Sequence, residues 1–326
     1  MSTQLLRPPL SVLFVTAMYP HAEQPGNGAF VMHQAEQLRA LGHHVDIVHV
    51  RGYQSRWNYV RGAAEVLRAT WVGRHDVVHV HYGLTGLCAL FRWRTPMVVT
   101  LHGSDMLEGR LQPLVSKLIS AVADSTIAVS PAIAGRTQGT LIPCGVDLER
   151  FRPADPAHAR SRLGLAPDGK YVLFPFDPSR RVKRYDIAEG AVALLRQRGV
   201  DAMLLPVWNV ANEMMPLYYS AADAMVLCSD TEGSPTSVKE ALACNLPVVS
   251  TDVGDVRTIL RGIDGTEICE PSVSAVAAGL GRVLQRAGRV FDGRSAMRRY
   301  DQRSTVQALV GVYCSVLRRA PRLSPS

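Results

Sequence analysis

One stretch decides the fold: Thr231-Glu-Gly-Ser-Pro-Thr-Ser-Val-Lys-Glu-Ala-Leu-Ala-Cys-Asn-Leu-Pro-Val-Val-Ser-Thr-Asp-Val-Gly-Asp255. It follows the apolar run Ala224–Leu227, which predicts a buried strand. Its own middle predicts a helix over Thr236–Cys244, and Val248–Ser250 predicts the next strand. Because a helix that joins two strands makes them parallel, the stretch predicts a β-α-β unit of a parallel sheet.

The same alternation of short β-branched runs and longer segments with helical spacing extends in both directions. The further strands are predicted at Val12–Val15, Val45–His49, Asp76–His81, Met97–Leu101, Thr126–Val129, Tyr171–Phe174, Ala202–Leu205 and Thr266–Cys269. The further helices are predicted at Phe30–Leu41, Tyr59–Val72, Leu84–Arg92, Leu111–Val122, Ile187–Arg198, Met214–Ala222 and Ser274–Arg286. The fold class is therefore α/β, with helices on both faces of parallel sheets.

A break in this alternation predicts two domains. Arg152-Pro-Ala-Asp-Pro156 and Leu165-Ala-Pro-Asp-Gly169 flank a short polar helix and are typical of a linker. We therefore expect an N-terminal Rossmann-like domain over residues 1–152 and a C-terminal one over 168–303. The amphipathic segment Ser304–Arg319 has no strand after it, so we expect it to pack back onto the first domain.

Composition excludes several classes of protein. The chain has 326 residues, 47% hydrophobic and 20% charged, which is typical of a globular protein. No apolar run approaches the roughly 18 residues of a membrane span, and the start lacks a secretion signal, so we expect a cytoplasmic protein. The net charge of +8 suits an anionic membrane or a phosphorylated substrate. Nucleic acid is disfavoured, since no helix-turn-helix or zinc-finger spacing accompanies the charge. The six scattered cysteines are expected to be free thiols.

The deciding stretch also carries a candidate ligand site. Glu232 follows a strand, at the sheet edge where open α/β sheets bind ligands. The helix start offers free backbone N–H groups for a phosphate, and Glu240 on its second turn can reach a diol. The residues at this helix start are Ser234, Pro235, Thr236 and Ser237. An ordinary helix start, with an acidic residue that stabilises the helix dipole, is the alternative.

Glu232, the seven residues after it, Glu240 and Ala241-Leu-Ala-Cys-Asn-Leu-Pro-Val-Val249 resemble the signature of the retaining glycosyltransferases of family 4. The resemblance covers nearly the whole chain and implies the GT-B fold, two Rossmann-like domains that face each other across a cleft. It further implies that Glu232 lies beside the donor sugar and Glu240 binds the ribose. The wording is closest to transferases of bacterial cell-surface polysaccharide assembly.

A second stretch, Phe174-Pro-Phe-Asp-Pro-Ser-Arg-Arg-Val-Lys-Arg-Tyr-Asp186, follows the first strand of the second domain. Two cations about one turn apart can clamp a diphosphate and neutralise the charge that grows on a leaving group. The resemblance assigns this work to an Arg and to Lys183. Arg180 fits the first position better than Arg181, but the sequence departs from the family's wording here and leaves both open. A solvated helix start is the alternative.

Two loops of the first domain complete the candidate site. Asn27 and Gly28 lie in Pro25-Gly-Asn-Gly-Ala-Phe30, which is no dinucleotide fingerprint but lets a ligand approach the backbone. Thr100-Leu-His-Gly-Ser-Asp105 supplies His102, Gly103 and Asp105. The resemblance puts a His near the donor sugar, and it puts the glycine loop near the donor phosphates and the acceptor. Asp105 can instead cap the segment that follows.

A metal site has little support. His79 and His81 share one face of a strand, but no carboxylate or Cys has supporting spacing, and the resembled family needs no metal or other cofactor. The turn Ile142–Phe151, with Cys144 where Asn is usual, is interpreted as structural.

The predicted function is transfer of a hexose from a nucleoside diphosphate sugar to a hydroxyl acceptor, with retention at the anomeric carbon. A glycan or a lipid-linked glycan is the expected acceptor, because the helix from Trp57 to Arg74 combines aromatic and basic residues and can lie on an anionic membrane. An ordinary surface helix explains the same pattern. The rival functions are a sugar-nucleotide epimerase or phosphorylase and a non-catalytic sugar-nucleotide-binding protein.

Overall fold

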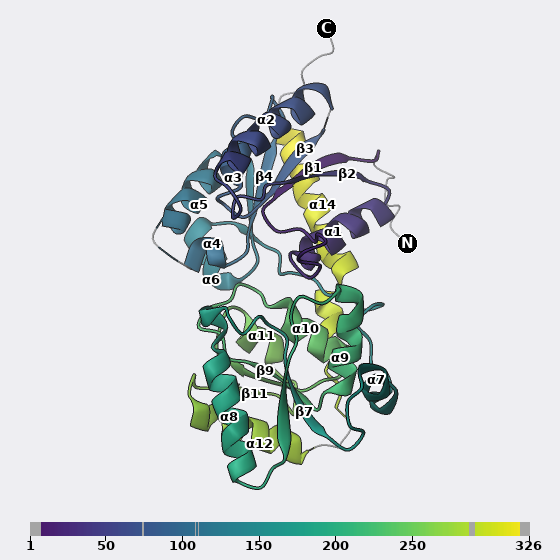
Figure 1. Cartoon of the computed structure of the whole chain (residues 1–326). Coiled ribbons are helices and arrows are strands. Elements are labelled where there is room, and N and C mark those ends of the chain that lie inside the picture. Colours follow the sequence, from purple (N-terminus) through teal and green to yellow (C-terminus); the bar gives the residue numbers. More distant parts are fainter. Residues whose placement is uncertain (1–7, 74, 108, 110, 287–290, 320–326) are drawn as a thin grey trace. The chain divides into compact units, whose positions relative to one another are not determined.

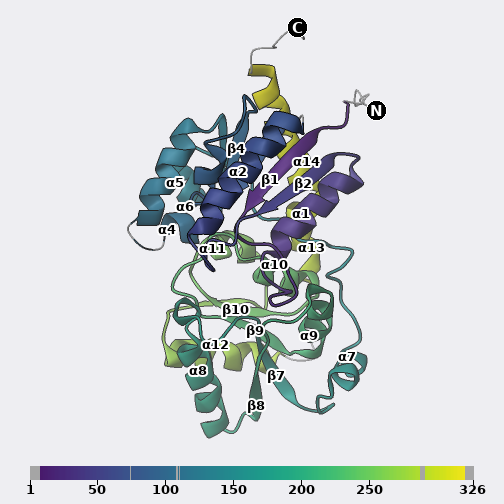
Figure 2. The same ribbon diagram turned by 45° about the horizontal axis from the view of Figure 1, so that its top comes forward.

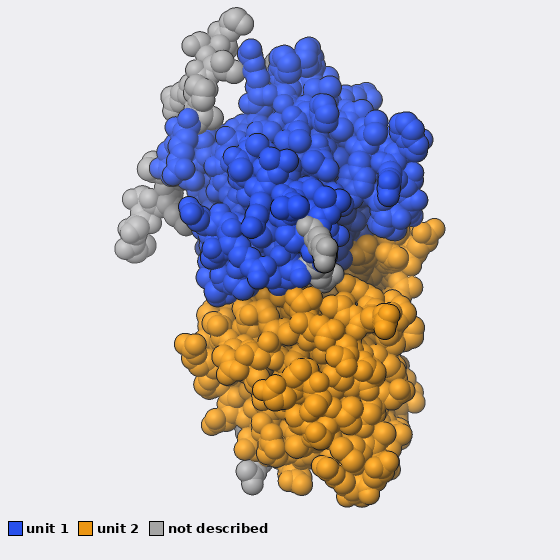
Figure 3. Space-filling model, turned by 90° about the vertical axis from the view of Figure 1, so that its left-hand side faces the viewer, with its two compact units in different colours: residues 1–19, 31–142, 306–326 blue, residues 20–30, 143–305 orange. Residues whose placement is uncertain are grey.

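The computed structural model describes residues 8–319 apart from 74, 108, 110 and 287–290 (Figure 1). Contacts divide the chain into two compact units (Figure 3). Unit 1 comprises the described parts of residues 1–19, 31–142 and 306–326, and unit 2 comprises the described parts of 20–30 and 143–305. The domain boundaries at 152 and 168 stay a prediction. Among the described helices, none is long and apolar enough to span a bilayer.

Unit 1 contains a six-stranded parallel sheet in the order β2-β1-β3-β4-β5-β6. Its strands are β1 (Ser11–Thr16), β2 (His44–His49), β3 (Val77–His81), β4 (Met97–Leu101), β5 (Ser125–Ala128) and β6 (Thr140–Leu141). Its helices are α1 (Ala29–Ala40), α2 (Trp57–Val72), α3 (Gly86–Ala89), α4 (Ser104–Leu107), α5 (Leu111–Val122) and α6 (Pro131–Thr137). The helix α14 (Gln302–Arg319) begins in unit 2 and continues from Val306 in unit 1.

Unit 2 contains a five-stranded parallel sheet in the order β11-β10-β9-β7-β8. Its strands are β7 (Lys170–Phe174), β8 (Ala202–Pro206), β9 (Ala224–Leu227), β10 (Val248–Thr251) and β11 (Glu267–Cys269). Its α-helices are α7 (Pro156–Leu163), α8 (Tyr185–Gln197), α9 (Met215–Ala221), α10 (Thr236–Ala243), α11 (Val256–Leu260), α12 (Val273–Gln285) and α13 (Arg294–Met297). Three 3-10 turns complete it: η1 (Arg181–Lys183), η2 (Asn212–Met214) and η3 (Arg298–Tyr300). The α/β class predicted from the sequence is confirmed in both units.

The strands β7 and β9 of unit 2 are apolar from Tyr171 to Phe174 and from Ala224 to Leu227, because both faces of the sheet are covered there. Leu173 and Met225 belong to one buried cluster, which includes residues of α10 and α11. Their neighbours Val172 and Val226 belong to the cluster that includes residues of α8 and α12. Successive side chains of a strand point to opposite faces, so each strand supplies both cores and its sequence shows a continuous apolar run instead of an alternation.

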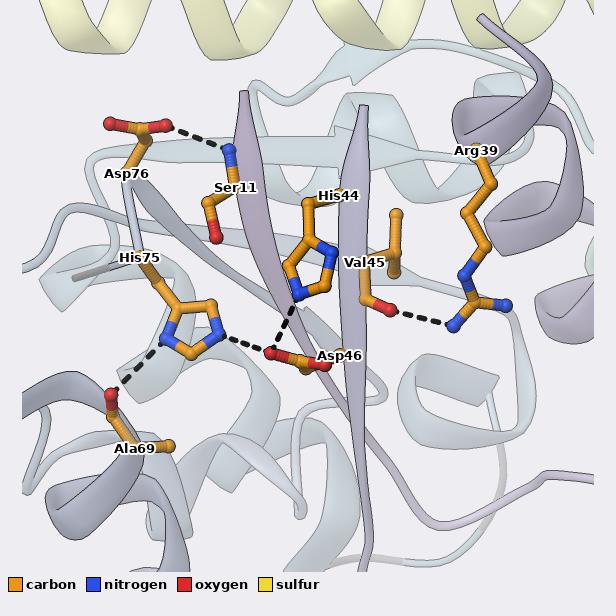
Figure 4. A network of polar contacts seen from close by, with 8 residues as sticks. All are labelled: Ser11, Arg39, His44, Val45, Asp46, Ala69, His75 and Asp76. Carbon is orange, nitrogen blue, oxygen red and sulfur yellow. Dashed lines mark hydrogen bonds and ion pairs between the residues drawn. The ribbon is translucent and has the colours of Figure 1, made fainter. Parts of the chain in front are cut away.

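A polar network joins the starts of three strands in unit 1 (Figure 4). Asp76 accepts a hydrogen bond of 2.7 Å from the backbone N–H of Ser11 at the start of β1. The neighbouring His75 lies 2.9 Å from Asp46 of β2 and 3.2 Å from the carbonyl oxygen of Ala69 in α2. The hydrogen bond from His75 is the main cause that holds the pKa of Asp46 below its ordinary value. The network fixes β1, β2 and β3 against one another at their starts.

The helix α14 is attached to unit 1 by a buried polar contact. Tyr313 Oη lies 2.7 Å from Nδ1 of His79, and Nε2 of His79 lies 2.7 Å from Thr100 Oγ1. His79 is fully buried on β3 and Tyr313 is also fully buried. Because both ring nitrogens of His79 have a partner, the histidine is satisfied in the core without a charge.

Candidate donor site

A lysine and a glutamate from neighbouring strands of unit 2 meet at the sheet edge. Lys183 ends η1, in the connection after β7, and Glu232 follows β9, which pairs with β7. Lys183 Nζ lies 2.5 Å from Glu232 Oε1, to which Ser229 also donates a hydrogen bond of 2.7 Å. The ammonium lies 4.4 Å from the ring centre of Phe176. The sequence placed Lys183 and Glu232 at one ligand site, and the structure brings them together.

The arginines before Lys183 differ from the one after it. Arg180 and Arg181 are both exposed, and among the described residues no hydrogen bond or ion pair engages either guanidinium. Arg184, held at a positive φ of 52°, contacts Asp186 at 2.9 Å and Asp230 at 3.1 Å. Arg184 therefore ties the two loops together, whereas Arg180 and Arg181 both stay available for a ligand, and the choice between them stays open.

The helix α10 begins at Thr236, as the sequence predicts. Pro235 is the N-cap residue rather than part of the first turn, with φ −65° and ψ 113°. The backbone N–H groups of Thr236 and Ser237 open the helix and have no partner within it. The hydroxyl of Ser234 points inward, where it donates to Asp255 Oδ2 at 2.7 Å. This helix start can thus offer backbone donors to an anion, while the Ser234 side chain serves the loop itself.

Glu240 lies on α10 in a largely desolvated position. Burial raises its pKa to about 7, and hydrogen bonds with Tyr219 and Thr236 oppose that rise. Tyr219 Oη donates to Glu240 Oε2 at 2.8 Å, and Tyr219 is fully buried in the unit 2 core. The tyrosine fixes one carboxylate oxygen. The carboxylate is therefore held in one orientation and changes its charge near neutral pH.

The sequence reasoning missed the buried Lys239. Its ammonium, completely shielded from solvent, donates to the carbonyl oxygen of Cys144 at 2.8 Å and to Ser234 Oγ at 2.5 Å. Asp255 Oδ2 lies 3.9 Å away, and the ring centre of Tyr300 lies 4.9 Å away. The sequence signal that indicates a buried Lys239 is its position between Val238 and Ala241, on the apolar side of the predicted helix. Lys239 thus holds the Gly-Ser-Pro loop, residues 233–235, in place through its hydrogen bond to Ser234.

The loop after β4 in unit 1 is organised by Asp105. Its carboxylate accepts hydrogen bonds from the backbone N–H groups of His102 (3.0 Å), Gly103 (2.9 Å) and Gly83 (3.3 Å). Burial raises its pKa to about 6 in spite of these bonds. Gly103 has φ 118°, which only glycine adopts readily. Asp105 thus holds the loop before it, which carries His102, and these hydrogen-bond partners do not lie in the segment that follows it.

His102 stacks on a second histidine. Its Nε2 lies 3.1 Å from Nδ1 of His81, and the two rings are 5.3 Å apart at an angle of 21°. Nε2 of His81 is buried without a hydrogen-bond partner in the described structure. Desolvation lowers the pKa of both His79 and His102 to about 3 and that of His81 well below its usual range. All three are neutral imidazoles at neutral pH.

Acid is expected to destabilise unit 1. A buried histidine with a lowered pKa contributes stability above about pH 6.5 and loses it as the pH falls toward the folded-state value. Each histidine that stays neutral in the fold costs about 1.4 kcal/mol per pH unit in that window. The midpoint of urea unfolding should fall steadily as the pH is lowered from 7.5 to 5. The control variant His158→Asn, at an exposed histidine, should show the same fall of its midpoint. A midpoint unchanged down to pH 5 would contradict the account.

The glycine loop after β1 groups with unit 2. Residues 20–30 belong to that unit, and a Cβ built on Gly26 would lie 3.3 Å from the carbonyl oxygen of Val210. Asn27 donates from Nδ2 to Gln24 Oε1 at 3.1 Å, and Gly28 has φ 68°. The sequence assigned Asn27 and Gly28 to the first domain because they follow its first strand.

Within the described residues, no cluster of three metal-ligating side chains is found.

Two family models match the chain. The model described as "Glycosyltransferase Family 4" matches residues 49–150, and the one described as "Glycosyl transferases group 1" matches residues 188–286. The D-inositol 3-phosphate glycosyltransferase of Frankia alni is 30% identical over 286 residues, which is 68% of this chain and 70% of that protein. The Bacillus subtilis protein TuaC, named as a glycosyltransferase of teichuronic acid biosynthesis, is 26% identical over 84% of this chain and 89% of its own. The match to the Geodermatophilus obscurus D-inositol 3-phosphate glycosyltransferase spans 66% of that relative's length.

Solved structures share the fold. A sucrose-phosphate synthase from Thermosynechococcus elongatus superposes with a TM-score of 0.79 at 19% identity, over 95% of this chain and 99% of that one. The Anabaena protein HepE in complex with UDP gives 0.68 at 15% identity, over 94% and 100% of the two chains. The two parallel-sheet units and these neighbours show the GT-B fold. The chain belongs to glycosyltransferase family 4.

Proposed function

We propose that the protein transfers a hexose from a nucleoside diphosphate sugar to a hydroxyl acceptor, with retention at the anomeric carbon and without a metal or other cofactor. One observation carries the proposal: Lys183 and Glu232 form a close pair at the edge of the unit 2 sheet. The start of α10 and Glu240 continue directly from Glu232 along the same chain segment. Cation, backbone donors and two carboxylates are the groups that a sugar diphosphate with a ribose requires.

Each residue then has a role in holding the donor. Lys183, with Arg180 or Arg181, binds the diphosphate and stabilises its growing charge, and the α10 start donates N–H groups to it. Glu240 accepts hydrogen bonds from the ribose hydroxyls, and Glu232 accepts them from the donor sugar. The other residues assigned to the donor and acceptor are Asn27, Gly28, His102, Gly103 and Asp105, of which Asp105 acts by positioning its loop.

The proposed reaction needs no enzyme nucleophile. The acceptor oxygen bonds to the anomeric carbon on the face from which the diphosphate leaves, and the bond from that carbon to the phosphate oxygen breaks. The acceptor hydroxyl proton passes to the departing phosphate oxygen, so atoms and charge balance. The protein contributes position and charge stabilisation. Lys183, already desolvated and fixed by Glu232, can act without reorganisation during the step.

We further propose that the acceptor is a glycan, free or lipid-linked, in bacterial polysaccharide or glycolipid assembly, and that the enzyme works in the cytoplasm at an anionic membrane surface. The match to TuaC, which covers most of both chains, supports the polysaccharide reading. The exposed Trp57 and Trp71 beside Arg61 and Arg68 on α2 support the membrane surface.

Calorimetric titration with a panel of nucleoside diphosphate sugars tests the donor site. One donor should bind tightly, and Lys183→Ala and Glu240→Ala should both lose that binding. Lys170→Ala is the matched control, because Lys170 is exposed at the opposite end of β7. A folded protein that binds no member of the panel would overturn the proposal. Binding with turnover but no acceptor would favour an epimerase, and binding without any turnover would favour a silent binding protein.

Donor binding should depend on pH through Glu240. Its pKa is about 7 in the free protein, so only about a tenth of the carboxylate is ionised at pH 6. Because ribose hydroxyls donate to the ionised form, affinity for the sugar nucleotide should fall about tenfold between pH 8 and pH 6. Glu240→Gln should bind weakly with no such dependence. An identical pH profile in wild type and Glu240→Gln would assign the ribose to another group.

A further inference from the structure

An apolar pocket lies between two helices of unit 1, and none of its lining residues is assigned to the donor. It has a volume of about 400 Å³, which falls in the range of small-molecule sites. Its lining is almost entirely apolar, and its residues are Tyr59, Val60, Ala63, Ala64, Leu67, Leu87, Cys88 and Phe91. The pocket exists because α2 packs closely over the start of α3. Gly62 permits this approach, since a Cβ there would lie 2.8 Å from Val50 and 3.3 Å from Cys88.

The pocket opens in the middle of an exposed apolar stripe. Trp57, Val60, Leu67 and Trp71 recur on α2 at intervals of one face of a helix, and all four are exposed, Trp57 to 73% and Trp71 to 61%. The opposite face of α2 is the buried one, with Gly62, Val66 and Thr70. An exposed stripe of this kind is not required for the core of unit 1.

The stripe continues on the neighbouring helices. α3 contacts both α2 and α5, and Figure 1 shows it between them, while Figure 2 shows α2 and α5 from another side. The Trp71 and Trp93 rings lie 4.3 Å apart. The exposed apolar residues of the other two helices and the segment after α3 are Leu90, Phe91, Trp93, Leu111, Leu114, Leu118 and Val122. We call these residues, with the α2 stripe, the three-helix face; exposed large apolar side chains gathered on neighbouring helices are typical of a docking site.

Basic residues outnumber acidic ones around the three-helix face. Arg61 and Arg68 lie on α2 next to the apolar stripe, and the α2 helix carries Glu65 as its one acidic residue. Lys117 is exposed on α5, and Arg94 lies over the Trp93 ring at 5.5 Å. Aromatic and aliphatic side chains bordered by Arg and Lys suit the interface of a bilayer that has anionic headgroups.

We propose that the pocket takes one acyl chain of an anionic phospholipid, and that the three-helix face rests on the bilayer that supplies this lipid. The apolar lining excludes a sugar or nucleotide, which would lose its hydrogen bonds there. The basic border selects the anionic headgroup at the pocket mouth. The inference deepens the membrane association included in the proposed function, but it stands on unit 1 residues that the donor site does not use.

The chain's own tryptophans report the docking face. Trp57, Trp71 and Trp93 belong to the three-helix face, whereas Trp208 lies in unit 2. Vesicles of phosphatidylglycerol with brominated acyl chains should quench the variant Trp208→Phe, which keeps the three. They should not quench the triple Phe variant that keeps Trp208 alone. Phosphatidylcholine vesicles should quench neither, and added salt should weaken the effect. Equal quenching of both variants would overturn the assignment of the face.

Filling the pocket tests the acyl chain itself. Lysophosphatidylglycerol with a 12-carbon chain, below its micelle-forming concentration, should bind with one chain per protein in calorimetry. Ala63→Phe should weaken this binding by about tenfold or more, because the chain loses its buried length. Ala132→Phe, at an exposed alanine of α6, is the matched control and should change nothing. Equal affinity in both variants would overturn the pocket.

The donor titration separates this inference from the proposed function. Sugar-nucleotide binding should be unchanged in Ala63→Phe. A protein that binds the donor but neither lysolipid nor vesicles would overturn the inference and leave the proposed function in place. Lysolipid binding without any donor binding would do the reverse. If sedimentation showed a dimer that Ala63→Phe dissociates, without lipid binding, the occupant would be a second copy of the chain and the proposal would be wrong.

Discussion

Lys183→Ala is expected to lower kcat by about 10²–10³-fold, the usual cost of removing one charge-stabilising group from a desolvated site. The ammonium lies in a largely buried position, within 2.5 Å of Glu232, so its charge is poorly screened by water. The charge on the diphosphate grows as the sugar departs, so kcat should fall in addition to the loss of donor binding, which raises KM. Steady-state kinetics with the donor that calorimetry identifies measure the fall in kcat.

Arg181→Ala is the matched comparison for this effect. Arg181 begins the same 3-10 turn and is exposed. If Arg180 contacts the diphosphate, Arg181→Ala should change kcat by less than about threefold, while Arg180→Ala should approach the effect of Lys183→Ala. Equal activity of wild type and Lys183→Ala would remove the cation from the mechanism and leave its pair with Glu232 as a structural contact.

Lys239→Met should destabilise unit 2 by about 3–5 kcal/mol. The substitution keeps the length and apolar stem of the side chain but removes its charge. Asp255, whose pKa burial raises, would lose its only cation among the described residues, and the carbonyl oxygen of Cys144 would lose a donor. Leaving a buried carboxylate without its partner is among the largest effects of a single substitution. Denaturant unfolding followed by circular dichroism measures the loss.

The double variant Lys239→Met, Asp255→Asn separates charge from packing. Removal of both charges should cost clearly less than the sum of the two single variants, because the residues form one network. Arg282→Met, at an exposed arginine of α12, should cost less than about 1 kcal/mol. Strict additivity of the two single effects would contradict a coupled network around the Gly-Ser-Pro loop.

The sheets could be predicted because both faces of each are covered. The runs around Leu173 and Met225 are continuously apolar, so each could be predicted as a strand from its own sequence, without knowledge of the strands that it pairs with. The pairing of Val146 with Asp301 was not visible, because the two residues lie far apart in the sequence and the contact is a single bridge. Residues 20–30 were assigned by chain order, whereas their contacts group them with unit 2.

The parts of the site that could be predicted are those whose residues must lie close together because of the order of the strands alone. Lys183 and Glu232 follow neighbouring parallel strands, whose carboxyl ends must meet at one edge. Lys239 was missed because a lysine in a helix is normally solvated. Only the tertiary structure shows that its ammonium donates hydrogen bonds to the Cys144 carbonyl oxygen and to Ser234. The choice between Arg180 and Arg181 depends on side-chain direction, which spacing in a loop does not fix.

The central claim is that unit 2 binds the donor through the start of α10 and the Lys183 loop. Hydrogen exchange of the backbone amides, with and without the nucleoside diphosphate sugar that calorimetry selects, tests it most directly. The account predicts slowed exchange at Thr236 and Ser237 and in residues 180–184, with the amides of α12 unchanged. Slowed exchange confined to other segments, with none at the start of α10, would contradict it.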